Sequence, residues 1–433
     1  MAKNLTGLPV ELLIGVVSLL DRPSLEELRC TCRLFRELTT PKLFETLQLF
    51  PRDENCRRLK SLLQGNTVGH HVRNVYLNTY EKEWWVDREL LDESSAADDI
   101  KEQISSLDQF PHLNHVTLCF ERHCYMAAYE LLWREPPQNL WFREAVLKSF
   151  FSFLVSSPVR LQSLAIRNFQ NTNISNLEIP ATMVQVLQGL RALCLDFVSM
   201  TMGREVEYLR EYPRVIPELP SIWLNPTTSS LEHLTLYSDE CFGLYPTFDL
   251  SSTHFLRLKS LRLGNYTFCH DVQVDWIISH ARTLRELYLD NCTILHEAVG
   301  WNKEDLETYY STLLSEEWKL IKRKKRRNFY LYKYPRRWHD YFTMFRTGLP
   351  LLRHFRIGKS SWGRGFPSEK ERDIIIRLSK DRYFHWDEAY ATVNQRVPYE
   401  MKDLPFCQVE DNEALCVLFR KIGQSVGEQN WIR

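Results

Sequence analysis

The sequence has no apolar run long enough to cross a membrane, since none approaches the roughly 18 residues that a spanning helix needs. It has no net charge either, because 55 Lys and Arg residues balance 55 Asp and Glu residues. Such a balance provides no overall field that would attract nucleic acid or an anionic membrane. We therefore expect neither a membrane nor a nucleic acid among the partners of this chain.

The sequence also lacks the cysteine pattern of a disulfide framework. Its 11 cysteines are an odd number, and several stand inside apolar stretches, as Cys194 and Cys416 do. Cysteine in such a place behaves as a small buried hydrophobe, and reduced thiols are typical of intracellular proteins. Glycine is scarce and aromatic residues make up 12% of the chain, which excludes a low-complexity protein. We expect a folded protein of the cytoplasm, the nucleus or both.

No motif of catalytic or cofactor chemistry is present. The Gly358-Lys359-Ser360 tripeptide has Arg353 where a P-loop needs its first glycine, and no H-E-x-x-H occurs. Histidine and cysteine residues are scattered without a second pair at zinc-finger spacing. These scattered positions are His70, His71, Cys124, Cys269 and His270. We expect no catalytic residue, no cofactor and no metal.

What the sequence does have is a strongly apolar segment from Leu8 to Leu20. It has no basic flank merging into the apolar residues and no small-residue cleavage site after them, which argues against a signal peptide. The pattern predicts a helix that ends at Pro23, a second helix that starts at a capping box of Ser24 and Glu27, and a third that ends at Pro41. Three short helices cannot bury so many leucines among themselves. They are expected to dock on the rest of the chain or on another protein.

The spacing of residues 8–38 resembles an F-box, whose pattern is roughly L-P-x-E-[IL]-[IL]-x-x-[IV]-x-x-x-L, a short gap, then L-x-x-L-x-x-[VT]-C-[RK]-x-[WF]-x-x-L. The departures are small: Thr31 stands where valine is common, and Phe35 where tryptophan is. The resemblance implies that this segment binds the Skp adaptor of a Skp–cullin–F-box ubiquitin ligase. It assigns the adaptor contact to Leu8, Pro9, Glu11, Leu12, Leu13, Val16, Leu20, Leu25, Leu28, Cys32, Phe35 and Leu38.

A block with the pattern L-x-x-L-x-L recurs through the rest of the chain. Clean copies start at Leu161, Leu190, Leu231, Leu258 and Leu284, and looser copies start at Val72, Leu113 and Leu352. The spacing of 26 to 41 residues between clean copies is typical of a strand and a helix per repeat, with insertions. We predict an α/β fold in which an N-terminal three-helix F-box precedes an irregular leucine-rich-repeat solenoid. Strands of an ordinary α/β domain are the alternative. Fungal F-box proteins with degenerate repeats resemble this arrangement.

These patterns divide the chain into four parts: an F-box over 5–45, a connecting segment with a first divergent repeat over 46–110, repeats over 111–360, and a capping segment over 361–433.

Three further segments carry expectations of their own. The capping segment has a helix predicted from Asn412 to Ile422, with Gly423 as its C-cap. An insertion near 315–340 contains the basic run from Lys322 to Arg327, which is a nuclear localisation signal, a phosphate-binding patch or a solvated helix face. The acidic stretch from Glu89 to Asp108 is expected to be a flexible loop or an exposed helix.

The resemblance implies a non-catalytic adaptor that holds Skp, and through it a cullin, while the repeats bind a target protein. One alternative is a binding or scaffold protein that uses Skp without a cullin, and a more remote one is an enzyme with an unrecognised site in the repeat groove. Residues between the leucines must face the opposite side of each strand. They form a candidate target-binding face of His233, Thr235, Tyr237, Ser260, Arg262, Glu286, Tyr288 and Asp290. Loops or insertions are the other places where a target could bind.

Overall fold

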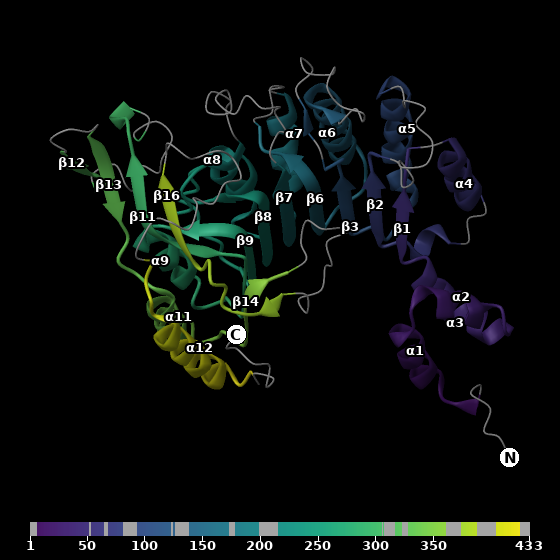
Figure 1. The fold of residues 1–433 in the computed structure, drawn as a ribbon. Coiled ribbons are helices and arrows are strands. Elements are labelled where there is room, and N and C mark those ends of the chain that lie inside the picture. Colours follow the sequence, from purple (N-terminus) through teal and green to yellow (C-terminus); the bar gives the residue numbers. More distant parts are fainter. Residues whose placement is uncertain are drawn as a thin grey trace. The chain divides into compact units, whose positions relative to one another are not determined.

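The computed structural model describes residues 7–51, 53–64, 68–80, 93–122, 124–125, 138–172, 178–198, 215–304, 306, 317–322, 328–360, 374–387 and 404–424. These residues form an α/β fold with three N-terminal helices and a large, mostly parallel mixed sheet (Figure 1). The α/β class of the predicted fold is therefore confirmed, with three helices at the N-terminal end. Among these residues, no helix combines the length and the apolar character that crossing a bilayer requires. The chain divides into two compact units, one of residues 1–122, 127–167 and 176–189, the other of the remaining residues.

The first unit begins with the three helices and continues with alternating strands and helices. In order these are α1 Val10–Leu19, α2 Arg22–Arg29, α3 Arg33–Leu43, β1 Thr46–Leu49, α4 Asp53–Gln64, β2 Asn74–Asn78, α5 Glu93–Ser105, β3 His115–Cys119, β5 Gln138–Asn139, α6 Leu140–Ser156, β6 Ser163–Gln170 and α7 Glu178–Leu187. The last residues of β6 belong to the second unit. Single 3₁₀ turns over Gly69–His71 and Ser106–Gln109 precede β2 and β3.

The parallel strands of this unit align their apolar residues in register. Val75 of β2 pairs with Val116 of β3, which pairs with Leu164 of β6, and all three side chains are fully buried. In a strand, alternate residues point to one face, so such pairs stack into a continuous apolar layer. The strands β2, β3 and β6 fall on three of the predicted repeat blocks, whereas β1 was not predicted.

Four local expectations for this unit need correction. The α2 helix is capped by Asp21, whose side chain accepts a hydrogen bond from the Ser24 backbone N–H at 3.1 Å, so the predicted capping box at Ser24 is wrong. The first helix ends at Leu19 and not at Pro23, which lies in the first turn of α2. The α3 helix runs through Pro41 to its end at Leu43, so Pro41 lies inside the helix and does not end it. Finally, most of the acidic stretch forms α5, in which Ile100, Gln103 and Ile104 are buried, so it is neither a loop nor fully exposed.

The second unit contains the clearest repeats. Its elements are β4 Cys124–Tyr125, β7 Ala192–Val198, α8 Val215–Leu219 with further helical turns to Thr227, β8 His233–Phe242, β9 Ser260–Phe268, α9 Asp271–Ser279, β10 Glu286–Asp290, β11 Thr293–Gly300, β12 Lys319–Ile321, β13 Phe329–Lys333, α11 Trp338–Gly348, β14 His354–Lys359, β15 Ile375–Ile376, β16 Tyr383–Asp387 and α12 Gln408–Ile422. The strands β7, β8, β9, β10 and β14 pair in parallel in that order.

The repeat blocks of the second unit pair without a slip at their leucines. Leu193, Leu234, Leu261 and Leu287 are consecutive partners, and Phe355 of β14 continues the row. Each of these side chains is at most 1% exposed. Because a one-residue slip would turn every leucine to the opposite face, the buried row fixes the register.

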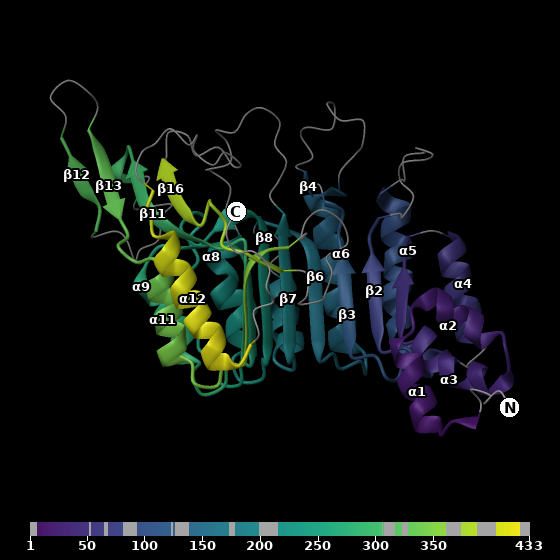
Figure 2. The ribbon, with the colours of Figure 1, turned by 60° about the horizontal axis from the view of Figure 1, so that its bottom comes forward.

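A strand group that the sequence did not predict lies beside the repeats. The strand β11 pairs with β13 antiparallel and with β16 parallel, and its first residues also pair with β9 (Figure 2). The strands β11, β12 and β13 lie between β10 and β14 in the chain. They account for the long spacing between the block that starts at Leu284 and the block that starts at Leu352.

The last described helix, α12, leads to a contact with β14, which also pairs with β15 at Gly358 and Lys359. It begins at Gln408, four residues before the predicted start, and ends at the predicted Gly423, whose φ of 69° is left-handed. The side chain of Gln424 then donates a hydrogen bond to the Phe355 carbonyl and accepts one from the Phe355 N–H, both at 3.0 Å. This side-chain amide takes the place of a neighbouring strand.

Candidate functional site

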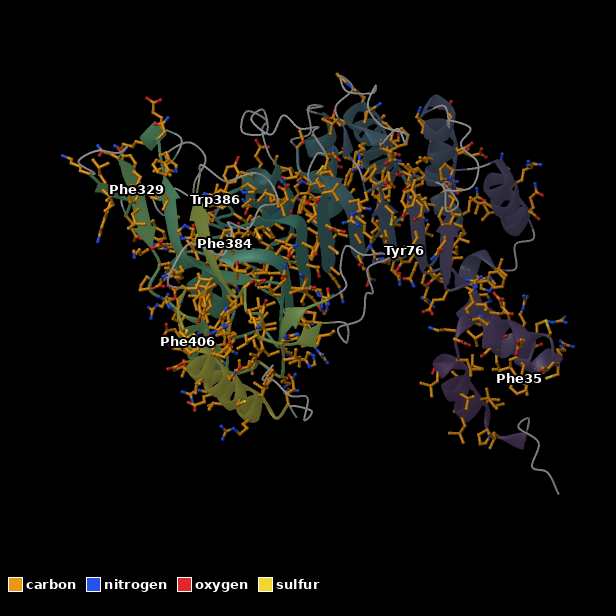
Figure 3. All side chains as sticks on the ribbon, in the orientation of Figure 1. Phe35, Tyr76, Phe329, Phe384, Trp386 and Phe406 are labelled. Carbon is orange, nitrogen blue, oxygen red and sulfur yellow. The ribbon has the colours of Figure 1, made fainter. Side chains whose placement is uncertain are left out.

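The three N-terminal helices share a small apolar core. Val17 of α1, Leu25 of α2 and Leu43 of α3 form a buried cluster, and none is more than 6% exposed. Leu13 lies one turn before Val17 and is also buried. Phe35 of α3, labelled in Figure 3, is buried as well. These contacts use only one face of α1.

A second, outward face of α1 carries unpartnered apolar side chains. Leu12, Val16 and Leu19 are 57%, 38% and 86% exposed. Their spacing of four and three residues places them in one row along the helix. Of the thirteen large apolar side chains exposed in the described part of the chain, six lie between residues 8 and 19. We call Leu12, Val16 and Leu19 the α1 row.

The structure divides the twelve predicted adaptor-contact residues by exposure. Buried inside the chain are Leu13, Leu25 and Phe35, half-buried are Leu20, Leu28 and Leu38, and exposed are Leu8, Pro9, Glu11, Leu12, Val16 and Cys32. The buried side chains stabilise the helices, and the exposed ones offer surface. The motif did not include Leu19, although its spacing from Leu12 and Val16 puts it in the same row.

The eight residues of the candidate target-binding face lie on three neighbouring strands, as expected. Ser260 of β9 pairs with His233 on one side and Glu286 on the other, and Arg262 pairs with Thr235 and Tyr288. The accessible members are His233, which is exposed, and Thr235, Ser260, Arg262 and Glu286, which are half-buried. Tyr237, Tyr288 and Asp290 are buried, so they offer little surface.

Local packing explains why these three residues are covered. The ring of Tyr237 lies on Gly264, where an added Cβ would come within 1.9 Å of it. Burial raises the pKa of the Tyr237 hydroxyl, so it stays protonated. The guanidinium of Arg262 lies 5.6 Å from the centre of the Tyr288 ring, within cation–π range. Both carboxylate oxygens of Asp290 accept hydrogen bonds from Ser360, one from its backbone N–H at 2.8 Å and one from its hydroxyl.

The burial of Asp290 changes the pKa of its carboxyl group. Burial raises the pKa of its carboxyl group, and this effect outweighs the opposing hydrogen bonds from Ser360. The accessible part of the face is therefore a band of His233, Thr235, Ser260, Arg262 and Glu286. The buried side chains of Tyr237, Tyr288 and Asp290 do not belong to this band.

Other residues singled out in the sequence lie apart from these surfaces. Most of the basic run, residues 323–327, lies outside the described residues, whereas Lys322 is described and exposed. The Gly358-Lys359-Ser360 tripeptide ends β14, where a Cβ on Gly358 would come within 1.9 Å of the Ile375 carbonyl oxygen. None of the nine cysteines whose side chains the structure describes is in a disulfide.

One polar cluster was missed by the sequence reasoning. His339, Cys407 and Asp411 each offer a metal-binding atom, and these atoms lie within 4.8 Å of one another. No other group of three or more such residues occurs in the described part of the chain. His339 is far from Cys407 and Asp411 in the sequence, so only the packing of α11 against α12 reveals the cluster.

Comparisons with known proteins add no family. No protein-family model matches the chain, and no curated protein matches it.

Proposed function

We propose that this chain is a non-catalytic substrate-recognition adaptor of a Skp–cullin–F-box ubiquitin ligase. In this proposal the three N-terminal helices bind the Skp adaptor, and the repeats hold a target protein near the ubiquitin-loaded enzyme. The contribution to the rate is proximity, because a tethered target has a high effective concentration. The proposal includes an irregular leucine-rich-repeat solenoid as the form of the repeat region, and localisation in the cytoplasm, the nucleus or both.

The α1 row is the observation that carries the proposal. Soluble proteins rarely leave large apolar side chains clustered at their surface unless a partner covers them. Leu12 and Leu19 are more than half exposed, while Leu13 and Val17 of the same helix hold the internal core. The helix therefore has one apolar face for the chain and another available for a partner. The F-box-like spacing of these helices supports Skp as the proposed partner.

The solenoid part of the proposal is supported by the unbroken register of the leucines. Equivalent leucines of four consecutive blocks are direct cross-strand partners, from Leu195 through Leu236 and Leu263 to Leu289. Each repeat thereby buries its apolar face on the next, which is the energetic principle of a repeat array.

Substitution of the α1 row tests the adaptor contact. Leu12→Asp places a charge where an apolar interface would form, which costs several kcal/mol when no partner group compensates it. We expect capture of purified Skp to be lost while the circular dichroism spectrum is unchanged, because Leu12 is not part of the internal core. Ser18→Asp is the matched control, since it adds the same charge to an exposed polar position of α1. Full Skp binding by the Leu12→Asp variant would contradict the proposal.

Co-purification from native cells distinguishes the ligase adaptor from a Skp-bound scaffold. The proposal expects both Skp and cullin with the wild-type chain and neither with the Leu12→Asp variant. Recovery of Skp without cullin would favour the scaffold.

The accessible band on β8–β10 is the proposed target contact. His233 is exposed and Arg262 is half-buried, and arginine is among the residue types that most often anchor protein interfaces. After proteasome inhibition, Arg262→Ala is expected to weaken capture of the target by about 1–2 kcal/mol without affecting Skp. Unchanged target ubiquitination by a variant carrying both His233→Ala and Arg262→Ala would exclude this band as the contact.

A further inference from the structure

The cluster around Asp411 joins three segments that are distant in the sequence. Asp411 lies in the first turns of α12, His339 lies near the start of α11, and Tyr383 begins β16. The helices α11 and α12 lie side by side in both views of the ribbon (Figures 1 and 2). Phe406, labelled in Figure 3, is almost fully exposed just before Cys407, whereas Asp411 is completely buried.

The carboxylate of Asp411 is surrounded by nitrogen and oxygen donors and by the sulfur of Cys407. Its Oδ1 lies 3.1 Å from the backbone nitrogen of His339 and 3.0 Å from the Nδ1 of the same residue. Its Oδ2 lies 2.8 Å from Arg382 Nε, 2.8 Å from the Tyr383 hydroxyl and 3.6 Å from Cys407 Sγ. A carboxylate has about four lone-pair positions, and the four nitrogen and oxygen donors fill them. The single hydrogen of the Cys407 thiol has a closer acceptor in the Tyr383 hydroxyl, which lies 3.1 Å from the sulfur.

Cys407, His339 and Asp411 can nevertheless share one metal ion, because a ligand atom of each lies within 4.8 Å of the other two. If the Cys407 thiol loses its proton and His339 turns a lone pair of Nδ1 toward the centre, both groups become metal ligands. Asp411 Oδ1 can then bind the ion while keeping the hydrogen bond from the His339 backbone. Its Oδ2 keeps Arg382 and Tyr383, which would orient the carboxylate as outer-shell partners usually do.

The donor set identifies the class of metal. One thiolate, one imidazole and one carboxylate suit zinc, which is bound by sulfur, nitrogen and oxygen ligands in tetrahedral sites. The outer nitrogen of His339 also has a carboxylate nearby, since Asp340 Oδ1 lies 3.8 Å from Nε2. Carboxylates commonly accept the second N–H of a metal-bound histidine. The His339 side chain is 32% exposed, which leaves a path for the ion and for a water molecule as fourth ligand.

We propose that Cys407, His339 and Asp411 form a zinc site that fastens α12 to α11. The site does not depend on the proposed function of the chain. Cobalt(II) is the probe, because it takes zinc positions and its bond to a thiolate gives a charge-transfer absorption. The full-length chain is expected to take up one tightly bound cobalt ion with this absorption, to exchange it for zinc, and to unfold at a higher temperature with zinc than with chelator.

Two variants and one control test the assignment. Cys407→Ser is expected to abolish the charge-transfer band and the zinc-dependent shift in melting temperature. His339→Gln is expected to weaken zinc binding about tenfold or more, a loss typical of a damaged metal site. Cys416→Ser removes an exposed thiol of the same helix outside the cluster and is expected to bind as the wild type does. A folded wild-type chain without the band, or a Cys407→Ser variant that keeps it, would overturn the site.

Discussion

The side-chain amide of Asn291 donates a hydrogen bond to the side-chain carbonyl of Asn265 on the neighbouring strand. Asn265 in turn donates to the backbone carbonyl of Ser238 at 2.5 Å. Both asparagines have left-handed backbone angles, with φ of 53° and 59°, which asparagine tolerates better than most residues. All three residues stand two positions after the last leucine of a repeat block. The repeats are therefore joined by a polar bridge just after their leucines as well as by the leucines themselves.

Replacing Asn265 is expected to reveal the strength of this bridge. Asn265→Ala removes a buried donor and acceptor and puts alanine in a left-handed conformation, so we expect a loss of about 2–3 kcal/mol in the free energy of unfolding. Urea denaturation followed by circular dichroism measures it. Asn265→Gly is the control, because glycine accepts the backbone angle and should lose about 1 kcal/mol less. Equal midpoints for the wild type and the alanine variant would show that the bridge contributes nothing.

From the surroundings of His280 we predict that the folded chain loses stability in mild acid. Its Nε2 accepts a hydrogen bond from the Phe255 N–H at 3.1 Å and its Nδ1 lies 2.9 Å from the Trp276 carbonyl oxygen, which fixes the neutral ring with the proton on Nδ1. Burial is the main cause that lowers the pKa of His280 from 6.5 to about 4. Between these pH values the unfolded chain binds more protons than the folded one. The contribution is therefore complete above about pH 6.5 and is lost as the pH falls toward 4, by about 3 kcal/mol in total.

The pH dependence of unfolding measures this effect. His280→Gln cannot titrate and should have a smaller slope of stability against pH in this window. His254→Gln is the control, because the two rings stack with their centres 4.5 Å apart but His254 is exposed. An NMR titration in which His280 takes up its proton near pH 6.5 in the folded chain would contradict the prediction.

Tyr237 and Gly264 predict an energetic coupling between neighbouring strands. A Cβ at position 264 would lie 1.9 Å from Tyr237 Cδ2, so Gly264→Ala must displace the ring and should cost about 1–3 kcal/mol. In a Tyr237→Ala background the ring is absent and the same substitution should cost much less. A double-mutant cycle by chemical denaturation measures the coupling, which we expect to be at least about 1 kcal/mol. Gly189→Ala is the control, because nothing lies within 4 Å of its added Cβ. Additive effects in the cycle would rule out the contact.

The repeat strands could be predicted because their signal is local. Leu261 and Leu263 stand two positions apart, so they point to one face of a short strand, and Leu258 precedes that strand. This spacing predicts that the three side chains are buried together, and the structure buries all three. The end of α12 was predicted for the same reason, since Gly423 supplies a left-handed cap that most residues avoid.

The remaining features depend on residues that meet only in the folded chain. The strand β11 pairs with β13 and β16, which lie well downstream in the sequence. No periodic pattern links these three strands. The burial of Asp290 arises from Ser360, which is 70 residues away. Exposure on a strand face was predicted from alternation alone, and alternation decides which side a residue faces but not what covers that side.

The bridge between Gln424 and Phe355 bears on how the chain avoids self-association. An open strand edge offers backbone N–H and carbonyl groups that the strand of a second molecule can pair with, and this is a common start of aggregation. At Phe355 both groups are already used by one glutamine side chain. A chain cut before residue 424 would leave this edge of β14 open, and it would be prone to join other copies through their sheets even where its own fold persisted.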